Sequence, residues 1–370
     1  MHAGAYEPAI HALAALAQRV AGRYGAVVIF AARLTVLGSL NMDISVTVPS
    51  LPGPGATVLG SAAVFAPGGK GANQAVAAAR LGADAGMSVA MIGCTGDDDF
   101  GRALRAALRA EGIDDGAVRT VTGVPTGIAM ITVDQAGENM ITVAPGANHQ
   151  LSEADIATTA PPAAPSAGSR VLVISAEVSA PVISAALAAS AGRVLRVLNL
   201  APAPPEAAEL VAAGPDWLVV NESEAAAVLG RPVAGLSAAA AAAADLVTAG
   251  ARNAVVTAGA AGAAYCGPRS AAGDGSREPD GDRPSVGQDK NVVVTVPGFK
   301  VQATDTVGAG DTFVGALAVA LAAGVAPADA VTAAAAAGAT AATRPGAQSG
   351  MPRPADIFAV TGHSWPVTAR

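Results

Sequence analysis

The segment 305–313, DTVGAGDTF, combines small, glycine-rich backbone with a carboxylate, Asp311. The apolar residues that follow recur at helical spacing: Phe313, Ala316, Leu317 and Leu321. A helix that begins here directs unpaired backbone N–H groups and its positive dipole end at the segment, which favours an anion such as phosphate. A carboxylate beside bound phosphate is unfavourable unless it takes part in chemistry. Alternatively, Asp311 and Thr312 only cap the helix, and the segment alone is compatible with both interpretations.

A second polar group follows the first predicted strand, where the side chains of Asn41 and Asp43 should project at its carboxyl end. The segment 68–74, GGKGANQ, adds Lys70, Asn73 and adjacent glycines that let backbone approach a ligand closely. These four side chains supply hydrogen bonds suited to a polyhydroxylated molecule. Asn and Asp are also ordinary turn formers, which is the alternative for the first pair. The glycine segment does not match the phosphate-loop pattern GxxxxGK[ST].

Composition excludes several classes of function. The chain has 370 residues, of which 52% are hydrophobic, enough for one large α/β domain or two smaller ones. Its net charge of −7 and the absence of a Lys/Arg run argue against nucleic-acid binding. Cys94 and Cys266, far apart in apolar contexts, indicate reduced thiols and a cytoplasmic protein. We find no HExxH or CxxC pattern, no membrane-spanning segment or clear secretory signal, and no GxGxxG where a dinucleotide fold would need it.

Strand-like and helix-like segments alternate along the chain. The predicted buried strands are 34–40, 89–92, 171–174, 194–200, 217–220 and 254–257. The predicted helices are 72–81, 101–111, 181–191, 222–229, 237–249 and 312–323. Alternation of this kind predicts βαβ units and a mostly parallel sheet covered on both faces, with ligands at the carboxyl ends of the strands.

Two segments, within about 43–66 and 126–145, alternate apolar and polar residues and predict a small second sheet that acts as a lid or a pairing surface. Residues 268–290 are rich in Gly, Ser, Asp, Arg and Pro and read as a flexible surface insertion. We divide the chain into three parts on this basis. They are an N-terminal extension of unknown role (1–32), a main domain (33–355) and a C-terminal tail (356–370).

Four segments together resemble the signatures of the ribokinase/PfkB family of sugar kinases, in the family's order and at plausible spacing. They are 41–43 (NMD), 68–74 (GGKGANQ), 221–224 (NESE) and 305–311 (DTVGAGD). The resemblance extends from about residue 34 to about residue 352, apart from the 268–290 insertion. It implies a ribokinase-like three-layer α/β/α fold with a mostly parallel central sheet and a small β-sheet lid.

The resemblance also implies a mechanism of in-line phosphoryl transfer. Asp311 would be the base that accepts the proton of the attacking sugar hydroxyl, and the backbone N–H groups of Ala309, Gly310 and Asp311 would stabilise the transferring group. Glu224, with Asn221, would organise Mg²⁺ on the nucleotide phosphates through water, because Mg²⁺ keeps much of its hydration. The alternative for this last pair is a capped helix start.

Further site residues carry over by resemblance. The sugar contacts would be Asn41, Asp43, Gly69, Lys70, Asn73, Glu177 and Asp311. The nucleotide contacts would be Asn221, Thr257, Gly259, Gly262 and Gly310. A K⁺ site would map onto Asp305, Val307, Ala341, Arg344 and Gly346. The match departs from the family where a hydroxyl residue is expected, because Gly350 stands there and Ser349 comes one position early.

The resemblance implies ATP-dependent phosphorylation of D-ribose at O5 and a homodimer formed through the lid. Alternatives are a kinase for deoxyribose, fructose, adenosine or pseudouridine, and a sugar sensor without turnover. Nucleoside kinases need an apolar or aromatic platform for the base, whereas the lid segments contribute only Phe65. A sensor would not require Asp311 and its glycine-rich segment, and both are intact.

Overall fold

The structure is a computed structural model that describes residues 33–159, 170–269 and 291–367. The predicted N-terminal extension and most of the predicted 268–290 insertion lie outside these residues. No helix within the described ranges is both long enough and apolar enough to span a membrane.

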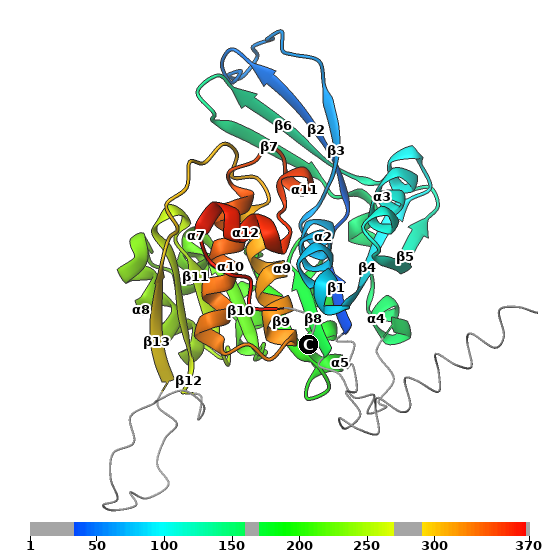
Figure 1. The fold of residues 1–370 in the computed structure, drawn as a ribbon. Coiled ribbons are helices and arrows are strands. Elements are labelled where there is room, and N and C mark those ends of the chain that lie inside the picture. The colour runs from blue at the N-terminus through cyan, green and yellow to red at the C-terminus, as the bar shows by residue number, and fades with distance from the viewer. Residues whose placement is uncertain (1–32, 160–169, 270–290, 368–370) are drawn as a thin grey trace, which may run out of the picture.

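A nine-stranded sheet forms the centre of the molecule, in the order β13-β12-β11-β10-β9-β8-β1-β4-β5 (Figure 1). Its strands are β1 (Arg33–Leu37), β4 (Ser88–Gly96), β5 (Asp114–Val121), β8 (Arg170–Ser175), β9 (Leu195–Asn199), β10 (Trp217–Asn221), β11 (Ala254–Thr257), β12 (Gly262–Pro268) and β13 (Asn291–Pro297). Only the pairings of β12 with β11 and with β13 are antiparallel, so the sheet is mostly parallel, as predicted.

Helices cover both faces of this sheet. One layer consists of α2 (Lys70–Gly82), α3 (Asp99–Ala110), α9 (Ala309–Ala322), α10 (Pro327–Ala341) and α12 (Pro354–Thr361). The other consists of α4 (Glu153–Thr159), α5 (Ala180–Ser190), α6 (Ala207–Ala212), α7 (Glu222–Leu229) and α8 (Gly235–Thr248). The predicted three-layer α/β/α arrangement is therefore confirmed.

Alternating strand residues supply the two cores between these layers. In β10, Trp217 and Val219 belong to the core under α9 and α10, whereas Leu218 and Val220 belong to the core under α7 and α8. Successive side chains of a strand point to opposite faces, so a central strand must be apolar throughout. Each fully buried Leu or Val contributes about 1.5–3 kcal/mol to folding.

A second sheet of four strands, in the order β3-β2-β6-β7, projects from one end of the large sheet (Figure 1). Its strands are β2 (Asn41–Val48), β3 (Val64–Gly68), β6 (Gly127–Asp134) and β7 (Asn139–Ala144). The last two form a hairpin within the predicted segment 126–145, and β2 pairs with β6 in parallel. We call this element the small sheet.

Two glycines let the chain cross from the large sheet to the small sheet beside α2. A Cβ on Gly38 would lie 2.8 Å from the Cα of Gly71, and a Cβ on Gly71 would lie 2.6 Å from the carbonyl carbon of Gly38. Real Cβ atoms do not approach backbone so closely, so both positions require glycine. The strand predicted at 34–40 consequently ends at Leu37, and the next three residues make the crossing.

The chain after residue 355 is part of the packed body rather than a separate tail. Ile357 of α12 is fully buried, and Trp365 and Val367 are 6% and 3% exposed. The indole Nε1 of Trp365 donates a hydrogen bond to the carbonyl of Leu81 at 3.0 Å. The boundary that we predicted at 355 is therefore too early, because it divides α12 and omits these core residues.

Candidate active site

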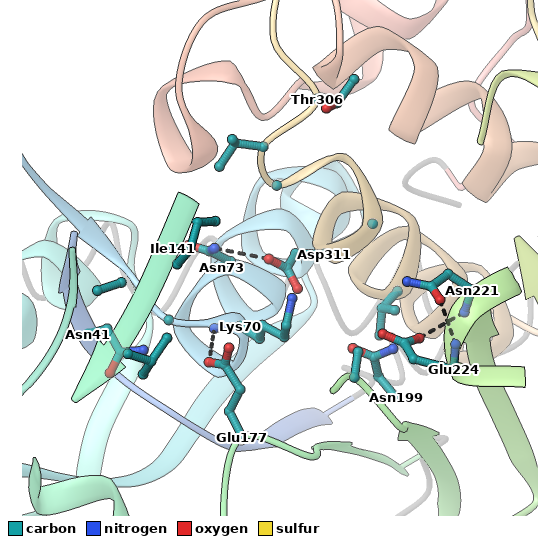
Figure 2. Close-up of a pocket in the computed structure, with 18 of the residues that line it drawn as sticks. Asn41, Lys70, Asn73, Ile141, Glu177, Asn199, Asn221, Glu224, Thr306 and Asp311 are labelled. Carbon is teal, nitrogen blue, oxygen red and sulfur yellow. Dashed lines mark hydrogen bonds between the residues drawn. The ribbon is translucent and has the colours of Figure 1, made fainter. Parts of the chain in front are cut away.

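A cavity of about 310 Å³ lies at the carboxyl ends of the large-sheet strands, between them and the small sheet. Most predicted site residues line it (Figure 2). Those on its wall are Asn41, Asp43, Gly69, Lys70, Asn73, Glu177, Asn221, Glu224, Thr257, Val307, Gly310 and Asp311. The small sheet adds the apolar residues Ala129, Ile131, Ile141 and Val143.

Asp311 lies in the first turn of α9, which begins at Ala309 rather than at the predicted residue 312. Gly308 precedes the helix in the left-handed region, with φ 75°. The N–H groups of Gly310 and Asp311 have no hydrogen-bond partner among the described residues, whereas the N–H of Ala309 donates to the carbonyl of Thr306 at 3.2 Å. Ala309 also lies outside the cavity wall. Two of the three predicted N–H groups are therefore free for an anion.

Asp311 is 8% exposed, and two side-chain amides of α2 hold its carboxylate. Asn73 Nδ2 donates to Oδ2 at 3.0 Å, and Gln74 Nε2 donates to Oδ1 at 3.1 Å. Gln348 Nε2 donates in turn to Asn73 Oδ1 at 3.1 Å, which directs the NH₂ group of Asn73 at the carboxylate. Both of these donors are neutral amides, so they orient the carboxylate without neutralising its charge. Asp311 thus has a fixed position on the cavity wall.

Gln74 and Gln348 are absent from the sequence-based set of site residues. Gln74 does belong to the GGKGANQ segment, and it shares a helix face with Lys70, four residues earlier. That spacing could have identified it. Gln348 reaches Asn73 from a distant part of the chain, and no local pattern indicates this contact.

Four carboxylates of the cavity act on the charge of Lys70. The pKa of Lys70 is raised, chiefly by Asp311 and then by Glu177, Glu224 and Asp43, against the opposing effect of burial. The pKa of Asp43 is raised to about 7, first by burial and then by repulsion from Glu177 and Asp311. Lys70 is therefore firmly cationic, and the site carries excess negative charge next to it.

Glu177 connects Ser39, in the segment that crosses between the two sheets, with Lys70 at the start of α2. Its Oε2 accepts hydrogen bonds from the Ser39 hydroxyl at 2.5 Å and from the backbone N–H of Lys70 at 3.1 Å. The carboxylate that the sequence places after strand β8 is thus engaged by protein groups as well as facing the cavity. It holds the GGKG backbone in position.

Glu224 and Asn221 form a capping box at the start of α7. Asn221 Oδ1 accepts from the Glu224 N–H at 2.9 Å, and Glu224 Oε2 accepts from the Asn221 N–H at 2.8 Å. Burial raises the pKa of Glu224 more than the hydrogen bond from Asn221 lowers it. Both residues also line the cavity, so the capping and ligand-facing interpretations hold together.

Of the other predicted nucleotide contacts, only one of the described residues lines the cavity. Thr257 lines the cavity and donates from Oγ1 to the Val220 carbonyl at 3.4 Å. Gly259, in the turn before β12, and Gly262, the first residue of β12, lie outside the cavity wall. A Cβ on Gly262 would lie 2.0 Å from the carbonyl oxygen of Val296, so close strand packing alone requires this glycine.

The residues predicted for a monovalent cation lie together behind the N-terminus of α9. Asp305 accepts from the N–H groups of Val307 at 3.0 Å and Gly346 at 2.8 Å. A Cβ on Gly350 would lie 3.2 Å from the carbonyl oxygen of Arg344 and 3.4 Å from that of Ala341. Two carbonyl oxygens thus face one small space that a side chain at residue 350 would fill, an arrangement of hard oxygen donors that suits a cation.

The side chains near this space make other contacts. The guanidinium of Arg344 pairs with Asp356 at 2.8 Å, and Ser349 Oγ donates to the Pro345 carbonyl at 2.9 Å. Arg344 would therefore contribute its backbone rather than its side chain. No group of three or more His, Cys, Asp and Glu side chains in the described ranges is arranged to hold a metal ion.

Comparison with known proteins agrees with this geometry. Residues 31–354 match the pfkB family carbohydrate kinases. The chain is 36% identical to a ribokinase of Haemophilus influenzae over 331 residues, which cover 90% of this chain and 99% of that protein. It is 34% identical to a ribokinase of Schizosaccharomyces pombe, over 86% of this chain and 94% of that protein.

Solved structures show the same fold. The ribokinase of Thermotoga maritima superposes with a TM-score of 0.71 at 31% identity, over 89% of this chain and 99% of that one. The ribokinase of Arabidopsis thaliana, solved with ribose and ATP, has a TM-score of 0.72 at 26% identity, over 90% of this chain and all (100%) of that one. The matched range includes Asp311 and the whole cavity wall. The chain therefore belongs to the pfkB family of carbohydrate kinases.

Proposed function

We propose that the protein transfers the γ-phosphoryl group of ATP to O5 of D-ribose, giving D-ribose 5-phosphate and ADP. The observation that carries this proposal is the position of Asp311, which two amides hold on the cavity wall at the free N–H groups of α9. Its carboxylate accepts the O5 proton as that oxygen attacks the γ-phosphorus. The N–H groups of Gly310 and Asp311 stabilise the charge of the transferring phosphoryl group.

The rest of the cavity is suited to the two substrates. Asn41, Asp43, Gly69, Lys70, Asn73 and Glu177 offer donors and acceptors to the sugar hydroxyls. Asn221, Thr257 and Gly310 also line the cavity and would contact the nucleotide. The cation of Lys70 compensates negative charge between these two regions.

A compact sugar suits this cavity better than a nucleoside such as adenosine or pseudouridine. No aromatic side chain of the described residues lines the cavity wall. Phe65 of β3 packs instead against Phe100 of α3, with ring centroids 6.1 Å apart. The relatives named ribokinase support ribose among the sugars. Deoxyribose and fructose are the competing substrates to test.

Mg²⁺ and K⁺ complete the proposal. A divalent ion on the nucleotide phosphates would neutralise their charge during transfer. The partly buried carboxylate of Glu224 faces the cavity and would hold Mg²⁺ through water, with Asn221 fixing its orientation. The backbone oxygens of Ala341 and Arg344, with Asp305, Val307 and Gly346, would hold K⁺ behind α9.

We further infer a homodimer formed through the outer face of the small sheet, the face away from the cavity. Ile131 lines the cavity, so its neighbour Met130 belongs to the outer face. Phe65, Met130 and Met140 on that face are 57%, 46% and 45% exposed, and a second copy would cover them. The free, buried thiols of Cys94 and Cys266 support the cytoplasm as its location.

The decisive experiment compares the unaltered protein with Asp311→Asn in a panel of sugars and nucleosides with Mg-ATP and K⁺. We expect ADP release with D-ribose and a fall in kcat of about 10²–10⁴-fold in the variant, because the base is lost. Asp329→Asn is the matched control, since this exposed carboxylate in α10 should be dispensable. Preference for another sugar would replace the substrate, and absence of turnover with any of them would refute the proposal.

A further inference from the structure

We propose that Asn148 is a positioning residue for sugar recognition, which holds the side-chain amide of Asn41 with its NH₂ group toward the cavity. This inference rests on the proposed function in one respect, namely that the cavity binds the sugar. Asn148 lies in the short 3₁₀ helix Gly146–Gln150, where the chain returns from β7 to the body of the molecule. It is 2% exposed and does not line the cavity itself.

The orientation of the Asn148 amide is determined by the backbone of Leu40. Its Oδ1 accepts from the N–H of Leu40 at 2.9 Å, and its Nδ2 donates to the carbonyl of Leu40 at 3.1 Å. Rotating the amide by half a turn would place donor against donor and acceptor against acceptor. Backbone groups cannot exchange their roles, so only one orientation of this buried amide is compatible with both bonds.

That orientation in turn fixes the amide of Asn41. The second proton of Asn148 Nδ2 is donated to Asn41 Oδ1 at 2.8 Å. Asn41 is 3% exposed and lines the cavity, and its Nδ2 has no hydrogen-bond partner among the residues that the structure describes. Its NH₂ group is therefore the part of the amide left for a ligand, and it offers donors to a sugar oxygen.

The residue opposite this amide pair confirms how tightly it is enclosed. Gly127, the first residue of β6, is paired with Asn41 in the small sheet. A Cβ on Gly127 would lie 2.3 Å from Asn41 Oδ1 and 2.4 Å from Asn148 Nδ2. Any side chain at this position would push the two amides apart. The pair thus depends on glycine here, on a buried amide at residue 148 and on the backbone of Leu40.

The contact also joins two places where the chain passes between the large and small sheets. Leu40 and Asn41 lead into β2, and Asn148 follows β7. The amide that would meet the sugar is consequently held from the body of the molecule and not only by its own strand. Sugar recognition by Asn41 should therefore depend on Asn148 although Asn148 touches no substrate.

The test is Asn148→Asp. The new carboxylate keeps an acceptor for the Leu40 N–H but turns an oxygen toward the Leu40 carbonyl and Asn41 Oδ1, so the Asn41 amide loses its fixed orientation. We expect the KM for D-ribose to rise roughly tenfold or more, as for one lost hydrogen bond in a binding site, with kcat and the KM for ATP within about threefold. Asn253→Asp is the control, because this buried amide bonds Asp216 and Tyr265 away from the cavity. It should lower Tm without changing the KM for ribose.

A double-variant cycle separates positioning from general destabilisation. In an Asn41→Ala background, Asn148→Asp should raise the ribose KM no further, because the amide that it positions is gone. Gly127→Ala disturbs the same pair from the other side and provides the test if the Asp variant does not fold. An unchanged KM in a folded variant, or an equal rise in both backgrounds, would overturn the inference alone. Failure of the unaltered protein to phosphorylate or bind ribose would overturn the proposed function as well.

Discussion

Asp311 depends on the side chains around it, and Gln74 is the most informative of these. Its Nε2 donates both to Asp311 and to Asn199 Oδ1, the latter at 2.8 Å. Its own Oε1 is buried without a hydrogen-bond partner in the described part of the chain. An unsatisfied buried acceptor lowers stability. We therefore attribute the role of Gln74 to the hydrogen bond that its Nε2 donates to Asp311, and not to a gain in stability.

We predict that Gln74→Met lowers kcat by about tenfold to a hundredfold, because the carboxylate of Asp311 loses one of the two donors that fix its position. Tm should change little, since the substitution also removes the unsatisfied oxygen. Steady-state kinetics at saturating ATP and ribose, with a melting curve, test both statements. Gln150→Met, at an exposed glutamine, is the control, and an unaltered kcat in Gln74→Met would contradict the prediction.

Asp43 is a cavity residue whose charge lowers the stability of the folded protein. Its pKa of about 7 in the folded protein lies above the ordinary value of 3.8, because burial and two neighbouring carboxylates oppose its ionisation. Well below pH 3.8, the carboxyl is protonated in both the folded and the unfolded state. As pH rises from about 4 to about 7, ionisation of the unfolded chain lowers the free energy of unfolding, and the full loss of stability persists above pH 7.

Asp43→Asn should therefore raise Tm at pH 8 by roughly 2 °C or more, and this gain should disappear toward pH 4. The same variant should bind ribose more weakly, because an acceptor of the cavity is replaced. Melting curves from pH 4 to pH 8 provide the measurement, with exposed Asp84→Asn as the control. A gain of equal size at both pH values would show that charge is not its cause.

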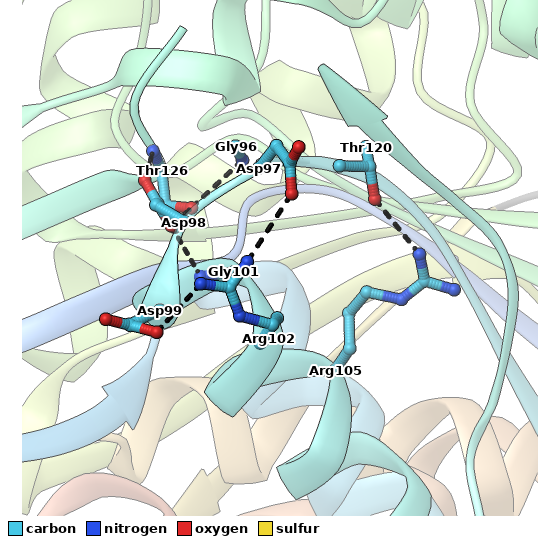
Figure 3. Close-up of polar contacts among 9 residues, drawn as sticks. All are labelled: Gly96, Asp97, Asp98, Asp99, Gly101, Arg102, Arg105, Thr120 and Thr126. Carbon is cyan, nitrogen blue, oxygen red and sulfur yellow. Dashed lines mark hydrogen bonds and ion pairs between the residues drawn. The ribbon is translucent and has the colours of Figure 1, made fainter. Parts of the chain in front are cut away.

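Among the elements, the junction of β4, α3 and β6 determines how the small sheet is attached (Figure 3). Asp98 caps α3 by accepting from the Gly101 N–H at 2.8 Å. It also accepts from the Thr126 hydroxyl at 2.6 Å and from the Thr126 N–H at 2.8 Å. Thr126 Oγ1 accepts in turn from the Gly96 N–H at 2.9 Å. One carboxylate thus connects the end of a large-sheet strand to the start of β6.

We expect Asp98→Ala to destabilise the protein by about 0.5–2 kcal/mol through the lost helix cap, with some further loss from Thr126. The KM for ribose should rise as well, because β6 carries cavity-wall residues. The neighbouring Asp99 is the control, since its side chain is 97% exposed and pairs with Arg102 on the surface. Asp99→Ala should change stability by no more than about 1 kcal/mol. Equal effects of the two substitutions would contradict this role of Asp98.

The sequence predicts elements well where their pattern is local. The helix predicted at 222–229 and the strand at 254–257 have those bounds in the structure. Helix α10 was not predicted, because its run of alanines gives no contrast between an apolar and a polar face. Strands β12 and β13 were not predicted either, since they flank the 268–290 segment and pair only with each other and β11.

The candidate site divides in the same way. Motif residues such as Lys70, Asn73 and Asp311 can be identified from sequence, and the structure brings them to one cavity. Asn148 contacts the motif residue Asn41, and Gln348 contacts Asn73, in each case from more than 100 positions away in the sequence. Such contacts leave no periodic or local signal in a single sequence, so only the folded chain identifies these residues.

For the whole molecule, we expect the exposed apolar residues on the outer face of the small sheet to form the proposed dimer interface. We predict that Met130→Glu converts a dimer to a monomer in sedimentation experiments, because burying an unpaired charge opposes association. Phe358→Glu is the matched control, since this residue is 60% exposed on α12 outside the small sheet. A dimer that persists in Met130→Glu would place the interface elsewhere.

The positions of the two tryptophans determine what the intrinsic fluorescence of the protein can report. Trp217 stacks on Tyr265 with ring centroids 5.3 Å apart, and Trp365 is anchored to the end of α2, so both indoles lie in the core and off the cavity wall. The chain has no other tryptophan. Its intrinsic fluorescence should therefore emit at short wavelength and shift to the red on unfolding, while remaining nearly insensitive to sugar. A tryptophan introduced at Ile141, on the cavity wall, would give an optical signal for occupancy against this quiet background.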